Sequence, residues 1–211
     1  MKLFNFHTHN IDENYGIINI YPEENILFGK KYSCGLHPWH YSENYETALS
    51  QIGLLAKEEK IVAVGETGFD PKSPVNIDMQ SKIFVKHIEI SEKYNLPLII
   101  HCVKHYNELV KIKSQLKPEN IWILHGFNGK IDIAKKLVEK GFYFSISENI
   151  LKDIKKADSL LEIIPTDTIF FETDDKDYNI ETIYKFVAEK YSMTLSDLVK
   201  YIEINLKIMG I

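Results

Sequence analysis

Short apolar runs recur along the whole chain and alternate with more polar segments. Several of these runs are continuously apolar, as strands buried on both faces of a sheet are. The pattern predicts eight β-strands, at residues 3–7, 16–21, 32–37, 61–66, 96–101, 121–125, 142–147 and 168–173.

Helical periodicity separates most of these predicted strands. Apolar residues repeat every three or four positions in residues 80–94, 105–116, 131–140 and 195–210. Strands that alternate with helices predict a parallel sheet, and eight such units predict a compact (β/α)₈ or TIM barrel of the α/β class. An open doubly wound sheet is the alternative, but the chain has no Gly-rich phosphate loop to support it.

The front of the chain is short for a standard barrel. About ten residues separate each of the first three predicted strands, which is fewer than a crossover helix needs. We therefore expect loops or single turns there, and a barrel with a shortened N-terminal region. Because no linker or repeat divides the chain, residues 1–211 are predicted to form a single domain.

The charge of the chain limits its partners. The formal net charge is −5, and all 25 positive charges are lysines. This excludes a strongly basic nucleic-acid coat but not a locally basic cleft.

Two cysteines cannot form a disulfide scaffold, and no run approaches the ~18 apolar residues of a membrane span. We expect a cytoplasmic protein with no membrane contact and no required protein partner.

Histidines gather where the predicted strands end. Seven of the eight lie at or just beyond the C-terminal end of a predicted strand: His7, His9, His37, His40, His101, His105 and His125. Three acidic residues, Glu66, Glu172 and Asp174, occupy the same place. In a parallel barrel these strand ends converge on the face where active sites are built. The remaining histidine, His87, lies within a predicted helix and is interpreted as structural.

The spacing and type of these residues favour a metal site. His7 and His9 are two positions apart, so on a strand they point the same way. Imidazole and carboxylate ligands without thiolates suit Zn²⁺, Mn²⁺ or similar ions. A lone histidine at a strand end is more often a hydrogen-bonded structural group. Together with His7 and His9, four further residues make six candidate ligands: His101, His125, Glu66 and Asp174. Six exceed what one tetrahedral ion needs, so two divalent cations sharing a carboxylate are predicted.

Six short motifs occur in a fixed order along the chain: FNFHTHN, CGLHPWH, VGETGFD, PLIIHC, LHGFNG and FFETD. In this order and at this spacing they resemble the TatD-type metal-dependent hydrolases, a branch of the amidohydrolase-like barrels. Gln80 and Phe84 also fit a Q-x-x-x-F helix of that family. The resemblance covers nearly the whole chain and implies the same barrel and hydrolytic chemistry.

The resemblance also implies roles for individual residues. By this resemblance, His7 and His9 would be ligands of a first metal, and Glu66 would be the bridging carboxylate. His101 and His125 would be ligands of a second metal, and Asp174 would be the final ligand. Glu66 and Asp174 are thereby the predicted catalytic residues, since the aspartate also handles the catalytic proton. His37 matches an additional histidine implicated in substrate or metal contact.

Several positions depart from the family pattern. Val103 stands where the family usually has an arginine, with Lys104 beside it, and Gly126 replaces a cysteine. Residues 175–178, Asp-Lys-Asp-Tyr, replace the usual A-P-Y-L. The altered positions lie on the substrate side. The resemblance therefore supports the metal chemistry more firmly than the substrate.

The resemblance implies hydrolysis of DNA phosphodiester bonds by a two-metal-activated water, at a single strand or a 3′ end. Zn²⁺ is the expected ion, with Mg²⁺ or Mn²⁺ as alternatives. His37, Lys104 and His105 are the predicted phosphate-binding residues, because the chain has no arginine. One alternative is the same metal centre acting on a small amide, lactone or phosphoester. Another is a non-catalytic binding protein on the same barrel.

Overall fold

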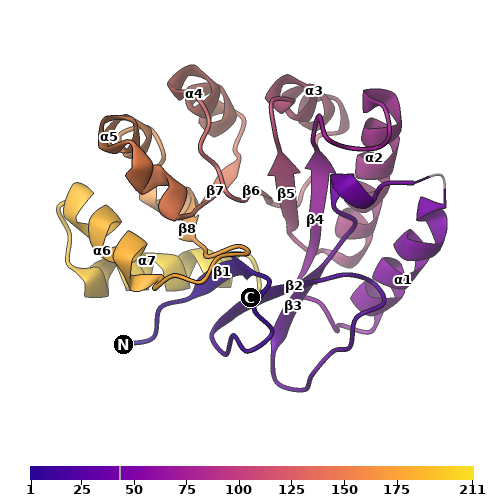
Figure 1. Ribbon diagram of the computed structural model, residues 1–211, viewed down its shortest axis with the longest axis horizontal. Coiled ribbons are helices and arrows are strands. Elements are labelled where there is room, and N and C mark those ends of the chain that lie inside the picture. The colour runs from indigo at the N-terminus through magenta and orange to yellow at the C-terminus, as the bar shows by residue number, and fades with distance from the viewer. Residues whose placement is uncertain (43) are drawn as a thin grey trace. The chain divides into compact units, whose positions relative to one another are not determined.

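After three consecutive strands, strands and helices alternate along the computed structural model, which describes residues 1–42 and 44–211 (Figure 1). The described strands are β1 (Asn5–Thr8), β2 (Gly16–Ile20), β3 (Lys31–Cys34), β4 (Ala63–Phe69), β5 (Leu98–Cys102), β6 (Trp122–Leu124), β7 (Tyr143–Ile146) and β8 (Ile169–Phe171). Each of them overlaps one of the predicted strands, so the predicted strand pattern is confirmed.

Seven α-helices are described, and four of them were predicted. They are α1 (Tyr45–Lys57), α2 (Ile77–Tyr94), α3 (Tyr106–Leu116), α4 (Ile131–Glu139), α5 (Ile154–Leu161), α6 (Glu181–Lys190) and α7 (Leu195–Ile208). The predicted helices correspond to α2, α3, α4 and α7, whereas α1, α5 and α6 are additional. Three short 3₁₀ helices are η1 (Pro38–His40), η2 (Glu148–Lys152) and η3 (Thr166–Thr168). No described helix combines the length and apolar character required to cross a bilayer.

The connections near the N-terminus are short, as expected. Between β1 and β2 the described chain makes a turn closed by a hydrogen bond from the Glu13 N–H to the Asn10 carbonyl. Between β2 and β3 it turns at Tyr21, whose carbonyl accepts from the Glu24 N–H. Neither described connection contains an α-helix, which confirms the shortened N-terminal region.

The described residues divide into two compact units. The first unit comprises Met1–Ile17 and His125–Ile211, and the second comprises Ile18–Leu124. In the second unit, β3, β4, β5 and β6 pair in parallel and in chain order. In the first unit, β7 pairs in parallel with β8, and Thr8 forms a parallel bridge with Asp174. Each unit therefore gathers the C-terminal ends of its own strands.

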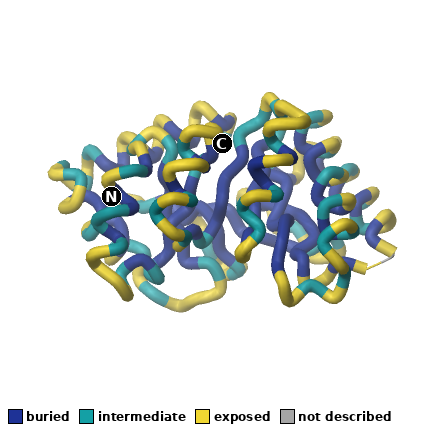
Figure 2. Tube along the Cα trace, turned by 90° about the horizontal axis from the view of Figure 1, so that it is seen from above, coloured by how far each residue is buried: buried dark blue, intermediate teal, exposed yellow. Residues whose placement is uncertain are grey.

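Both units bury their strands and expose the outer faces of their helices (Figure 2). All seven residues of β4 are buried, as expected for a parallel strand covered on both faces. In the second unit, Phe84 of α2 packs edge-on against Trp122 of β6, with ring centroids 5.3 Å apart. The core thus lies between strands and helices and leaves the strand ends for polar side chains.

His87 is the structural histidine that the helical pattern predicts. It is fully buried on α2, where its Nδ1 donates to the Ile83 carbonyl and its Nε2 accepts from the Leu36 N–H. Burial lowers its pKa to about 4, so the neutral form is the stable one in the folded protein. This confirms that His87 belongs to the packing and not to the site.

Two glycines of the VGETG segment allow β4 to approach β5 closely. Gly65 and Gly68 have φ values of +130° and +145°, which side-chain-bearing residues rarely adopt. A Cβ atom at Gly68 would collide with the carbonyl oxygen of His101. Glycine at these positions lets Glu66, which lies between them, reach the side chain of His101.

Candidate metal centre

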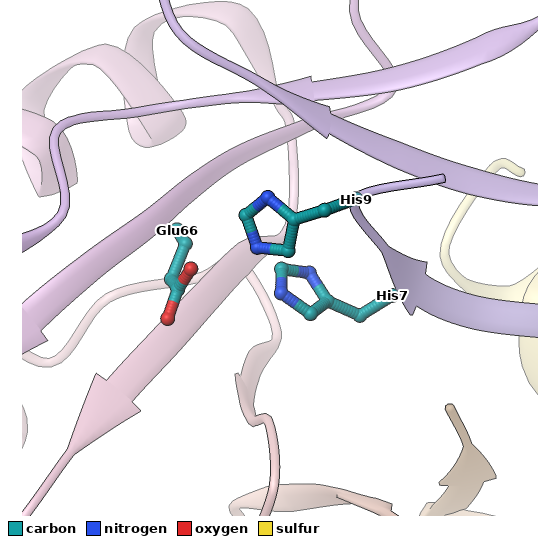
Figure 3. A group of neighbouring side chains, drawn as sticks. All are labelled: His7, His9 and Glu66. Atoms are coloured by element: carbon teal, nitrogen blue, oxygen red, sulfur yellow. The ribbon is translucent and has the colours of Figure 1, made fainter. Parts of the chain in front are cut away.

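In the first unit, His7 of β1 and His9, which directly follows β1, face the segment after β8. Their side chains point the same way, as predicted for positions two apart (Figure 3). Their Nε2 atoms lie 3.6 and 3.7 Å from Oδ1 of Asp174. The backbone holds this arrangement, because the His9 N–H donates to the Asp174 carbonyl and the Asp174 N–H donates to the His7 carbonyl.

His125, which follows β6 in sequence, completes this group. Its ring centroid lies 4.4 Å from that of His7. One ligand atom each from His7, His125 and Asp174 lie within 4.8 Å of one another. We call these three residues the first cluster. His7 is fully buried and Asp174 is 32% exposed at its side chain, so the cluster reaches solvent on the Asp174 side.

Glu172 lies behind the first cluster. It is fully buried, and its Oε1 is 3.3 Å from Nδ1 of His125. A carboxylate in this position orients the imidazole and leaves Nε2 for a metal. Its Oε2 has no hydrogen-bond partner among the described residues. A buried carboxylate oxygen without a donor is costly, so this group fits a neighbourhood that carries positive charge.

In the second unit, a matching group forms around Glu66. Its side chain comes from β4 (Figure 3) and is 4% exposed by residue. Oε1 of Glu66 is 2.9 Å from Nδ1 of His101 and 3.5 Å from Nε2 of His37. The ligand atoms of these three residues lie within 4.8 Å of one another. We call them the second cluster, and Asn19 supports it by accepting from the Glu66 N–H at 2.8 Å.

Asp70 orients the other side of the His101 ring. Its Oδ2 lies 2.9 Å from Nε2 of His101, and its Oδ1 accepts from the Lys72 N–H at 2.7 Å. Burial raises the pKa of Asp70, but the Lys72 N–H, the His101 ring and the Trp39 indole N–H together hold it below its ordinary value. The charged carboxylate is therefore the stable form beside His101.

Asp70 and Glu172 are two site residues whose roles the sequence does not predict. Both contact a predicted metal ligand, and both lie within the motifs VGETGFD and FFETD. Glu172 lies at a predicted strand end, but nothing in the sequence indicates that it contacts His125. Membership of the same short motif as Glu66 is the signal that could have identified Asp70.

The predicted phosphate-binding residues lie in different places. His37 belongs to the second cluster, next to Glu66. Lys104 is exposed between β5 and α3 and has a φ of +66°, in the left-handed region. His105 is the N-cap residue of α3 and is half-buried, with its ring centroid 6.3 Å from that of Phe69. Neither Lys104 nor His105 is among the residues of the two clusters.

A cavity of about 640 Å³ borders the first cluster. Its lining includes His9, Asp174 and the segment 175–178 that departs from the family pattern. Three further carboxylates and one lysine line it: Glu13, Asp175, Asp177 and Lys176. The cavity therefore carries an excess of negative charge beside a candidate metal ligand.

The donor sets of both clusters fit divalent cations. Each combines imidazole nitrogens with a carboxylate and contains no thiol, a combination suited to Zn²⁺ or Mn²⁺. Such donors within or just beyond parallel strands are typical of the metal-dependent hydrolases built on α/β barrels.

Sequence comparisons identify the family within this class. The profile of the family described as TatD related DNase matches residues 17–209, and the chain belongs to this family of metal-dependent hydrolases. It is 33% identical to the uncharacterized metal-dependent hydrolase YabD of Bacillus subtilis, over 67% of this chain and 57% of that protein. It is 31% identical to the uncharacterized metal-dependent hydrolase YcfH of Escherichia coli, over 72% of this chain and 56% of that protein. The chain thus spans little more than half the length of these relatives.

Solved structures confirm the fold. The TatD homologue YjjV of Escherichia coli superposes with a TM-score of 0.77 at 17% identity, covering 96% of this chain and 95% of that one. A TatD-family hydrolase of Entamoeba histolytica superposes with a TM-score of 0.78 at 17% identity, covering 98% and 97%. The predicted α/β fold, a compact TIM-type barrel, is confirmed.

Proposed function

We propose that the chain is a metal-dependent deoxyribonuclease that holds two divalent cations. The observation that carries the proposal is the pair of clusters, each with three ligand atoms from imidazole and carboxylate groups within 4.8 Å. The first cluster with His9 would hold one ion, and Glu66 and His101 with His37 would hold the other. That Glu66 bridges both ions, and that His101 and His125 share one ion, stay predictions from the family resemblance. Zn²⁺ is the expected ion, with Mg²⁺ or Mn²⁺ as alternatives.

Bound cations would supply Lewis acidity, which lowers the pKa of water and neutralises charge on the phosphate. Asp174 is the proposed proton acceptor. Its carboxylate faces His7 and His9 and borders the cavity of the first unit, so a proton can leave from there toward solvent. Glu172 and Asp70 hold the rings of His125 and His101 in fixed orientations.

We propose that a lysine ammonium group and histidine imidazoles bind the phosphate of the substrate. Lys104, His37 and His105 are the proposed contacts, because the chain has no arginine to form a bidentate pair. A single-stranded or 3′-terminal substrate is proposed, since a flexible strand end can reach ligands at the strand ends more easily than a rigid duplex can.

The test compares substrates on protein of measured metal content. We expect hydrolysis of single-stranded DNA that stops with a chelator and returns with Zn²⁺, Mn²⁺ or Mg²⁺. Asp174→Asn should keep its metal and lose about 10²–10⁴-fold in turnover, because a positioned base contributes that much. Asp132→Asn, an exposed residue of α4, is the matched control. Metal-loaded wild type that leaves DNA intact would rule out the nuclease proposal.

A second candidate is hydrolysis of a small amide, lactone or phosphoester by the same clusters. The specific observation in its favour is the acid-rich cavity beside Asp174, since carboxylates repel a polyanion. Hydrolysis of a neutral amide or lactone without hydrolysis of DNA would establish this alternative. Metal-loaded protein that hydrolyses none of these substrates would indicate a binding protein.

We also propose a cytoplasmic setting and a single cooperative domain. Cys34 and Cys102 are free and buried, as in a reducing compartment. Burial raises the pKa of the Cys34 thiol to about 12, so the thiol stays protonated and unreactive. One thermal unfolding transition, seen equally by near- and far-ultraviolet circular dichroism, would support a single domain over residues 1–211.

A further inference from the structure

Trp39 places a large aromatic ring at the surface beside the second cluster. It belongs to η1, two residues after His37, and is 48% exposed. Its ring centroid lies 4.9 Å from that of His37, with the two planes at 88°. The ring is therefore open to solvent and in edge contact with a residue of the candidate metal centre.

Several contacts fix this ring in place. The Trp39 backbone N–H donates to Nδ1 of His37 at 3.2 Å, and its indole N–H faces the carboxylate of Asp70. The hydroxyl of Ser73 donates to the Pro38 carbonyl at 2.7 Å, which ties η1 to the segment after β4. A single exposed aromatic residue is ordinary, but one held by the carboxylate that orients His101 is preorganised next to the site.

A positive charge accompanies the ring. Nζ of Lys72 lies 5.3 Å from the centroid of Trp39, and Lys72 is exposed. A second aromatic pair lies close by, because the rings of Tyr21 and His40 stack with centroids 4.9 Å apart. Exposed aromatic rings next to ammonium groups are the combination that binds single-stranded nucleic acid, by stacking bases and contacting phosphate.

We propose that Trp39 stacks against a nucleobase of a single-stranded substrate and that Lys72 contacts a neighbouring phosphate. This inference rests on the proposed nuclease function and adds a substrate-binding group to it. Stacking tolerates any base, so Trp39 confers preference for single strands over duplex without sequence specificity. It also supplies binding that does not depend on net positive charge, which suits a chain of net charge −5.

The experiment measures binding and kinetics with one set of variants. The binding probe is a phosphorothioate oligothymidylate that resists cleavage, and the signal is tryptophan fluorescence. Trp122 is the other tryptophan and is fully buried, so quenching by the oligonucleotide reports on Trp39. The variants are Trp39→Ala, Trp39→Phe and, as the matched exposed aromatic control, Phe28→Ala. Their binding is followed with a fluorescent label on the oligonucleotide.

We expect Trp39→Ala to raise Kd and KM by about 5-fold or more, with metal content unchanged, since one stacked base contributes that much. Trp39→Phe should keep most of the affinity, because it retains a ring while losing the indole N–H. Phe28→Ala should bind as the wild type does. An oligothymidylate with an abasic terminal position should bind the wild type more weakly and show no further loss with Trp39→Ala.

Each alternative result has a distinct meaning. Equal losses in Trp39→Ala and Trp39→Phe would show that the effect passes through the indole N–H to Asp70, and would overturn stacking. Wild-type kinetics for Trp39→Ala on DNA that the wild type cleaves would overturn the inference and leave the nuclease proposal standing. Failure of the wild type to cleave any DNA would overturn both.

Discussion

Substitution of Asp70 tests how much the orientation of His101 contributes to metal affinity at the second cluster. Oδ2 of Asp70 lies 2.9 Å from Nε2 of His101 and Asp70 is 3% exposed, so this is a buried, charge-assisted hydrogen bond. Such bonds contribute about 1.5–3 kcal/mol, against roughly 1 kcal/mol for a neutral one. Asp70→Asn should therefore weaken metal binding at the second cluster about 10-fold, and Asp70→Ala up to about 100-fold.

The assay is a Zn²⁺ titration against a chromophoric chelator, fitted to two sites. Only one of the two affinities should change, because Asp70 contacts His101 and not the first cluster's His125, which pairs with Glu172. The longer His125–Glu172 distance of 3.3 Å predicts a smaller effect for Glu172→Gln on the other affinity. Asp132→Asn serves as the exposed control, and melting of the metal-free variants separates loss of fold from loss of binding.

Two outcomes would contradict this reasoning. Unchanged affinities in Asp70→Ala would show that the orientation of His101 does not depend on its carboxylate partner. A parallel loss at both sites, with an unchanged melting temperature, would show that the two ions bind as one coupled unit.

Three further predictions concern substrate, pH and backbone. Lys104→Ala should raise KM for DNA at constant metal content and reduce the salt dependence of binding by about one phosphate contact, and equal kinetics across a salt series would reject this role. The pKa of His87 is about 4 in the folded protein and about 6.5 unfolded, so the unfolded chain binds more protons between these values. The free energy of unfolding should thus fall by up to about 3 kcal/mol from pH 6.5 to 4 in urea titrations, and His87→Gln should show a shallower fall. Gly68→Ala should lower the melting temperature by roughly 5–10 °C. Gly141 also has a left-handed φ, of +68°, but its surroundings are open, so Gly141→Ala should lower the melting temperature less.

Much of the fold could be predicted because strands and helices leave different periodicities. The β4 segment is apolar or small throughout apart from Glu66 and Thr67, and it forms a fully buried strand. The helices that were not predicted have weaker signals. The α5 helix has only eight residues, and in α6 the buried positions Ile183, Tyr184, Val187 and Ala188 lie among charged and exposed neighbours.

The candidate site was predictable in its residue types but not in its pairings. The strand-end rule identified Glu66, His101 and Asp174, yet periodicity alone would place Glu172 and Asp174 on the same side of a strand. In the structure β8 ends at Phe171, and Asp174 has a φ of +56°. The chain therefore turns, so that Asp174 faces His7 and His9 while Glu172 contacts His125.

The chain segments that make up each unit determine the order in which the two clusters can form during synthesis. The second cluster joins residues 37 to 101, whereas the first requires the β1 strand to meet a segment 166 residues later, as in the Thr8–Asp174 contact. All residues of the second cluster are synthesised before β6, whereas the first cluster must wait for Asp174, which follows β8. The entropic cost of closing the long segment between Thr8 and Asp174 rises only slowly with its length, but its length delays formation of the first cluster. In a cell, the nascent chain would hold His7 and His9 exposed to free metal ions throughout that interval.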